Sequence, residues 1–274
     1  MNLGVSTYSF WHFKGDKLPL KKYIELASRM GFSGVEILEN HLESLSADYL
    51  KGLRRQAFDL GLSIYSVSIH NNFVKPSVAE RDNELEKVKT MLNAAYTLGA
   101  TIARVNSGRW QTSKNFDELM AKKGVESPLP GYTDDDAFSW VKDSIEKLVP
   151  VAEDLGVIIG MENHWGVSKN AKDMVRLFSA IKSNSFRAIL DTGNFIEDTY
   201  HQMEVIAPYA AMVQAKTYFG GGVWYSLDLN YDTIFEILRR SGFNGWVSLE
   251  YEGNADYEEG VSKSKELLSK YIHH

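Results

Sequence analysis

Polar side chains stand where several hydrophobic segments end, and four of them could bind one cation. Glu162 closes "VIIGME", Asp191 closes "FRAILD", Glu250 closes "GWVSLE", and Gln214 lies within "AAMVQAKTY". Three carboxylates brought to one place repel one another unless they take up protons or a cation lies among them. Such oxygen donors favour Mn²⁺ or Mg²⁺, with Co²⁺ and Zn²⁺ as alternatives. We therefore predict one divalent metal ion, although a single strand-end carboxylate is more often a helix cap or a solvated loop residue.

Basic side chains follow two of these groups at a spacing of two residues. In an extended chain, residues two apart point to the same side, so His164 is expected beside Glu162 as a substrate contact rather than a structural histidine. His70, after the segment 62–69, has the same two interpretations. Lys216 follows Gln214 and either extends along a rim or contacts a substrate oxygen. A Schiff-base role is the weakest alternative, because nearby carboxylates would keep this lysine protonated.

Aromatic residues gather near the ends of the same segments. Most aromatic side chains pack in a core, but aromatic faces mixed with carboxylates also suit a sugar, which offers C–H faces and hydroxyl groups. We expect four of them to contact substrate: Tyr8, Phe10, Trp110 and Trp165. His12 and His41 are expected in solvated loops.

One pattern recurs along the chain and predicts the elements that position these residues. An amphipathic helix end is followed by Gly and then by a short apolar run, as in "ASRMGFSGVEI", "AYTLGATIARV" and "AEDLGVIIGME". Glycine just past a helix is a C-cap, because it adopts the left-handed conformation at little cost. Continuous apolar strands that alternate with helices are typical of a parallel sheet covered on both faces.

Eight such units are expected, which predicts a (β/α)8 TIM barrel as a single domain over residues 1–274. Strands are expected near 2–8, 34–37, 62–69, 101–106, 157–162, 186–191, 210–216 and 246–250. Helices are expected near 19–30, 46–60, 81–98, 134–155, 170–182, 199–207, 231–241 and 258–271. A doubly wound open sheet is the alternative, but "STYSFWHFKG" lacks its glycine-rich turn. The long insert after the fourth strand is either a surface loop or a lid over the barrel mouth.

Composition excludes several classes of protein. The chain has 274 residues, a net charge of −6 and no cysteine, so disulfides, thiolate catalysis and Cys-ligated zinc are ruled out. The acidic balance without basic runs argues against nucleic acid as a partner. No apolar run is long enough to span a membrane, and "MNLGVSTYSF" is not a signal peptide, so we expect a cytoplasmic protein. The terminal His273 and His274 are given no role.

The motifs "MENH", "LDTGN", "QAKTYFGGG" and "GWVSLEYEG", in this order, resemble the xylose-isomerase-like TIM barrels, a group of sugar-phosphate isomerases and epimerases. The resemblance covers nearly the whole chain. It implies that Glu162, Asp191, Gln214 and Glu250 bind the metal ion. Gln214 departs from the pattern because histidine is commoner there, and Asn194 likewise replaces a histidine and is expected to contact substrate.

The resemblance implies proton transfer at a carbon next to a carbonyl. Glu162 and Glu250 would act as an acid/base pair on opposite faces of a sugar or keto-sugar, through an enediolate. The first hypothesis is thus a metal-dependent sugar or sugar-phosphate isomerase or epimerase. The alternatives are a dehydratase of the inosose or 3-dehydroshikimate type and a sugar-binding barrel without turnover. The related endonuclease IV fits poorly, since its three zinc ions need many histidines. Relatives often form dimers or tetramers, which leaves a homo-oligomer open.

Overall fold

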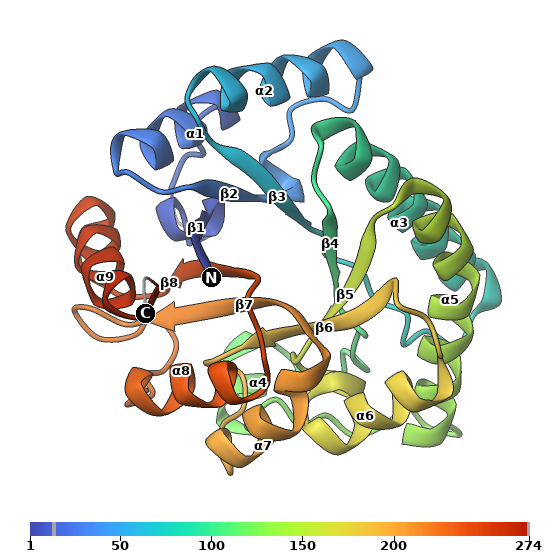
Figure 1. Ribbon diagram of the computed structural model, residues 1–274. Helices are drawn as coiled ribbons and strands as arrows, with labels where there is room; N and C mark the ends of the chain where they lie inside the picture. Colours follow the sequence, from blue (N-terminus) through green and yellow to red (C-terminus); the bar gives the residue numbers. More distant parts are fainter. Residues whose placement is uncertain (13–14, 273–274) are drawn as a thin grey trace.

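The strands of this chain close into a barrel. The computed structural model describes residues 1–12 and 15–272, so His273 and His274 lie outside the described residues. Strands β1 to β8 pair in chain order, and β8 pairs in parallel with β1 (Figure 1). The predicted (β/α)8 barrel is therefore confirmed, and the open doubly wound sheet is wrong.

The elements lie close to their predicted ranges. The strands are β1 Asn2–Ser6, β2 Gly34–Leu38, β3 Ser63–Ser68, β4 Ile102–Val105, β5 Ile158–Glu162, β6 Phe186–Asp191, β7 Ala210–Thr217 and β8 Trp246–Tyr251. The α-helices are α1 Leu20–Arg29, α2 Ala47–Asp59, α3 Val78–Leu98, α4 Phe116–Ala121, α5 Asp134–Leu155, α6 Ala171–Ala180, α7 Thr199–Ile206, α8 Tyr231–Arg240 and α9 Tyr257–Ile272. Short 3₁₀ turns are η1 Thr7–Phe10, η2 Glu39–His41, η3 Gly166–Ser168 and η4 Ala207–Tyr209. Among the described residues, no helix is long and apolar enough to cross a membrane.

Local capping explains where the helices begin and end. The Ser77 side chain accepts a hydrogen bond from a backbone N–H of the first turn of α3, so this helix begins three residues before the predicted position. Thr133 forms a capping box at the start of α5. Gly99 and Gly156 end α3 and α5 with φ of 82° and 64°, as the repeated pattern predicts.

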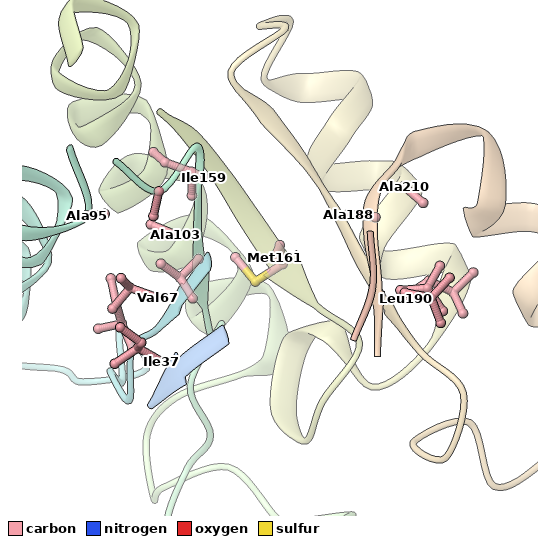
Figure 2. Packing of buried hydrophobic residues seen from close by; sticks show 14 of the residues in the cluster. Ile37, Val67, Ala95, Ala103, Ile159, Met161, Ala188, Leu190 and Ala210 are labelled. Carbon is pink, nitrogen blue, oxygen red and sulfur yellow. The ribbon is translucent and has the colours of Figure 1, made fainter. Parts of the chain in front are cut away.

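The large hydrophobic core lies between the barrel and its helices. Alternate strand residues such as Ile37, Val67 and Ile159 belong to one cluster with helix residues such as Ala95 (Figure 2). Alternation along a strand sends the intervening residues into the barrel. The strand sequences therefore need apolar side chains on one face for folding and leave the other face available for chemistry.

The inside of the barrel changes from apolar to polar along its axis. A small buried cluster of Tyr65, Ile102, Ile189 and Met212 lies inside the sheet. On three strands the inward residue becomes polar within one two-residue step: Ile102 to Arg104, Ile189 to Asp191, and Met212 to Gln214. Because all strands are parallel, these polar groups meet at the C-terminal end of the barrel, where the active sites of such barrels lie.

Candidate active site at the mouth of the barrel

The structure places the four predicted metal ligands on four neighbouring strands. Glu162 ends β5, Asp191 ends β6, Gln214 lies in β7 and Glu250 lies in β8. All four side chains are buried. Asp191 pairs in register with Gln214 across β6 and β7. Their arrangement follows from the sequence, because each stands two residues beyond an inward-facing residue of its own strand.

The Lys216 ammonium lies among carboxylates from two strands. Its Nζ is 3.1 Å from Glu252 Oε1, 3.5 Å from Asp191 Oδ2 and 3.6 Å from Glu250 Oε2. It also donates to Asn194 Oδ1 at 3.0 Å. Burial lowers the pKa of Lys216, but Asp191 and Glu252 outweigh it and hold the pKa well above its usual value. A charged ammonium is no nucleophile, so this geometry disfavours Schiff-base chemistry.

Arg104 forms the second buried ion pair of the mouth. Its Nε lies 3.2 Å from Glu162 Oε2, and both side chains are almost fully enclosed. Asn194 Nδ2 donates to Glu162 Oε1 at 3.0 Å. Asn194 therefore bridges Glu162 to Lys216, a link that a neutral amide provides because it both donates and accepts. Burial raises the pKa of Glu162, yet Arg104, His164 and Lys216 together lower it below its ordinary value.

Burial shifts the pKa values of four other ionisable groups near the mouth. Burial raises the pKa of Asp191 to about 7 against the opposing charge of Lys216, and it raises that of Glu250 well above its usual range. Burial also lowers the pKa of His70 to about 3 and that of His164 to about 4. Both imidazoles are consequently neutral at pH 7 and bring no positive charge to the cavity.

A cavity of about 360 Å³ opens at the C-terminal end of the barrel. Of the predicted site residues, it is lined by Tyr8, His70, Glu162, His164, Trp165, Asn194, Lys216 and Glu250. Leu38, Arg104, Phe116, Trp224, Tyr225 and Glu252 complete the lining. Glu252 was missed as a site residue, although its position two residues after Glu250, just past the end of β8, was a usable signal.

Two predicted substrate contacts lie elsewhere. Phe10 packs between Tyr23 and Tyr257, at ring-centroid distances of 5.9 and 6.0 Å. Trp110 donates from Nε1 to Asp134 Oδ1 at 3.0 Å and lines a separate cavity of about 80 Å³. Neither residue lines the mouth cavity, because strand-end position alone does not decide which way a loop side chain turns.

The long insert after β4 reaches the mouth. Phe116, at the start of α4 in this insert, meets Trp224 of the β7–α8 segment edge to face, with ring centroids 4.5 Å apart and planes at 64°. Both rings line the mouth cavity, and Trp224 is 42% exposed. The insert therefore contributes an aromatic wall to the mouth, as the lid interpretation requires.

Two histidines expected in solvated loops are buried instead. His41 is 3% exposed, shares a 3.0 Å hydrogen bond with Thr7 Oγ1 through Nδ1, and stacks on Tyr23 at 4.6 Å. His12 is 7% exposed and lies 5.1 Å from the Tyr251 ring. The prediction was wrong because 3₁₀ turns fold these short segments back onto the core.

Three buried oxygens at the C-terminal end of the barrel are of the type that a hard cation binds, although Asp191 and Gln214 lie beneath the residues that line the cavity. Glu162 Oε2, Asp191 Oδ2 and Gln214 Oε1 are buried and form no hydrogen bond with any described residue. Glu162 Oε2 is the ion-pair partner of Arg104, and Asp191 Oδ2 is an ion-pair partner of Lys216. Counting His, Cys, Asp and Glu alone, the described part of the chain holds no group of three arranged around a metal ion. Buried oxygens without hydrogen bonds are nevertheless the donor type that a divalent cation prefers, and a site here would need the Gln214 amide as well as the carboxylates.

Comparison with protein families agrees with the barrel fold. The family model described as xylose isomerase-like TIM barrel matches residues 24–271. The chain belongs to this family. A comparison with curated proteins gives no match.

Solved structures with the same fold cover nearly the whole chain. D-psicose 3-epimerase with D-tagatose from Clostridium cellulolyticum H10 has 17% identity and a TM-score of 0.79, with 100% of both chains covered. The apo 3-keto-D-glucoside 4-epimerase from E. coli has 17% identity and a TM-score of 0.78, covering 98% of this chain and 99% of the other. L-ribulose 3-epimerase has 16% identity and a TM-score of 0.72, covering 99% and 91%.

Proposed function

We propose that this family member is a metal-dependent sugar isomerase or epimerase. The observation that carries the proposal is the convergence of Glu162 and Glu250 on one cavity from β5 and β8. Two carboxylates that reach a small ligand from different strands are suited to move a proton from one face of a carbon to the other. The similar folds named above include epimerases that act on sugars at C3 and C4, which supports the same class of reaction.

The reaction assigns complementary work to the two glutamates. Glu162 removes the proton from the carbon next to the substrate carbonyl, and the electron pair moves into an enediolate. Glu250 then returns a proton to the opposite face of that carbon, which inverts it. Acid/base assistance of this kind contributes about 10²- to 10⁴-fold to the rate. Asn194 and Arg104 hold Glu162 in place, and Lys216 contacts Glu250.

Glu162, Asp191, Gln214 and Glu250 are the residues that would hold the metal ion. Mn²⁺ or Mg²⁺ fits their oxygen donors best, and Co²⁺ or Zn²⁺ would also be accepted. When bound, the cation supplies Lewis-acid polarisation of the carbonyl group. It would also balance the negative charge that three carboxylates bring together.

The substrate is proposed to be an unphosphorylated ketose or keto-sugar. The two charged basic groups that line the cavity, Arg104 and Lys216, are already paired with carboxylates. His70 and His164 are neutral at pH 7. A phosphate dianion would therefore meet carboxylates without a basic group to receive it. Trp165 and the Phe116–Trp224 wall offer apolar faces to the C–H surface of a sugar ring.

The test is product analysis on chelator-free protein loaded with Mn²⁺. A panel of ketoses and keto-sugars, free and phosphorylated, is incubated with the wild type and with Glu250→Gln. We expect a product of unchanged mass from an unphosphorylated substrate, with solvent deuterium at the inverted carbon, and no turnover by the variant. A product that has lost water and absorbs as a conjugated ketone would instead identify a dehydratase. Sugar binding without any product would indicate a binding barrel.

A further inference from the structure

Glu36 is a buried carboxylate that the proposed proton transfer does not use. It lies in β2 with no exposed surface, inside the barrel beneath the mouth. Its Oε1 accepts hydrogen bonds from Gln214 Nε2 at 3.0 Å and from the Ser68 hydroxyl. Its Oε2 accepts from Ser248 Oγ at 2.6 Å. A buried carboxylate is costly unless hydrogen bonds satisfy it, and here three strands supply the donors.

The Gln214 amide has two ends of opposite character, and Glu36 distinguishes them. The amide nitrogen can donate to a carboxylate, whereas the amide oxygen would be repelled by it. With Nε2 held by Glu36, Oε1 is left at the other end, buried and without a hydrogen bond from any described residue. Glu162 Oε2 and Asp191 Oδ2 are likewise buried and without a hydrogen bond from any described residue. The reverse orientation would set two oxygens against each other and turn an N–H₂ group toward the cation site.

We infer that Glu36 is a positioning residue that holds the Gln214 amide oxygen toward the cation site. The inference rests on the proposed function, in which Gln214 is a metal ligand. A carboxylate presents an oxygen in either orientation, but an amide needs a partner that selects its oxygen. Glu36 supplies that selection, so that glutamine can serve at a position where histidine is commoner.

The experiment measures Mn²⁺ affinity directly and needs no substrate. Chelator-treated protein is titrated with Mn²⁺, and free Mn²⁺ is followed by electron paramagnetic resonance. We expect Glu36→Gln to raise the Kd about 10- to 100-fold, the usual cost of losing a residue that orients a ligand. Ser248→Ala is the matched control. It removes a different hydrogen bond to Glu36 but leaves the carboxylate to hold Gln214, so its Kd should stay within about threefold of the wild type.

Rescue separates orientation from general damage. The double variant Glu36→Gln/Gln214→Glu exchanges the amide and the carboxylate, so a donor again faces a carboxylate and an oxygen again faces the cation. We expect it to bind Mn²⁺ at least as tightly as the wild type. If Glu36→Gln does not fold, as judged by circular dichroism, this double variant and Glu36→Asp, which withdraws the carboxylate from Gln214, take its place.

The possible failures are distinguishable. A folded Glu36→Gln protein with the wild-type Kd would overturn the positioning role and leave the metal site in place. Failure of the double variant to recover affinity lost in Glu36→Gln would also count against it. A wild type that binds no Mn²⁺ would remove the metal from the proposed function, and the positioning role would fall with it.

Discussion

Replacing Glu162 with Gln should damage both activity and stability, whereas the same change at Glu250 should damage activity and lower stability much less. The difference lies in what each substitution leaves behind. Arg104 Nε forms an ion pair with Glu162 Oε2 at 3.2 Å, and both side chains are almost fully buried. Lys216, by contrast, keeps Asp191 and Glu252 when Glu250 is neutralised.

The structure sets the expected magnitudes. Removing one partner of a buried ion pair costs about 3 kcal/mol or more, because an uncompensated charge remains. In a chain of this length that corresponds to a Tm roughly 6 to 12 °C lower. The 3.6 Å contact of Glu250 with Lys216 is too long for a hydrogen bond. Its loss should therefore cost about 1 kcal/mol, or roughly 2 to 4 °C.

The assay combines thermal melts in the absence of metal with product analysis. Arg104→Met/Glu162→Gln is the control, because removing both charges should restore part of the stability lost in Glu162→Gln. Glu162→Gln melting no earlier than Glu250→Gln would refute the ion-pair argument. Turnover near the wild-type rate in either variant would refute the two-glutamate mechanism.

Three other perturbations test separate parts of the structure. Saturating Mn²⁺ should raise the Tm by roughly 5 to 10 °C, and EDTA should reverse the change. Elemental analysis should give about one metal ion per chain. A Tm that changes with neither Mn²⁺ nor EDTA would contradict the metal site. Trp224→Ala should raise KM about 3- to 10-fold, as expected for the loss of an aromatic contact, whereas Tyr132→Ala, outside the cavity, should leave it unchanged. Burial and Lys17 lower the pKa of His41 to about 4, so the unfolded chain binds the extra proton first as pH falls. His41 should contribute up to about 3 kcal/mol of stability above about pH 6.5, and this contribution should be lost toward pH 4. The pKa values of His70 and His164 are lowered in the same way, so His41→Gln should make the acid decline shallower in denaturant titrations without removing it.

The repeating units were predictable because their signals are local. Gly99 and Gly156 end helices wherever a left-handed residue is needed, and strand lengths follow from short apolar runs. Helix α4 was missed, since its six residues in the insert carry too short a pattern to recognise. The N-terminus of α3 was misplaced by three residues, because the Ser77 cap was overlooked.

The candidate site was partly predictable for the same reason. Glu162, Asp191, Gln214 and Glu250 stand at strand ends, and parallel strands bring such ends together. Phe10 and Trp110 satisfied the same rule but turn toward other parts of the molecule. Their direction depends on packing partners that lie far along the chain.

The amino-acid sequence by itself determined the order of strands and helices, and it determined which residues share one side of a strand. Both properties depend on neighbours within a few positions. Only the tertiary structure decided which polar groups pair. Glu36 and Gln214 are 178 positions apart, and Lys216 in β7 reaches Glu252 just past the end of β8. Such pairs depend on the register and closure of the barrel, because a shift of one residue would turn each inward side chain outward.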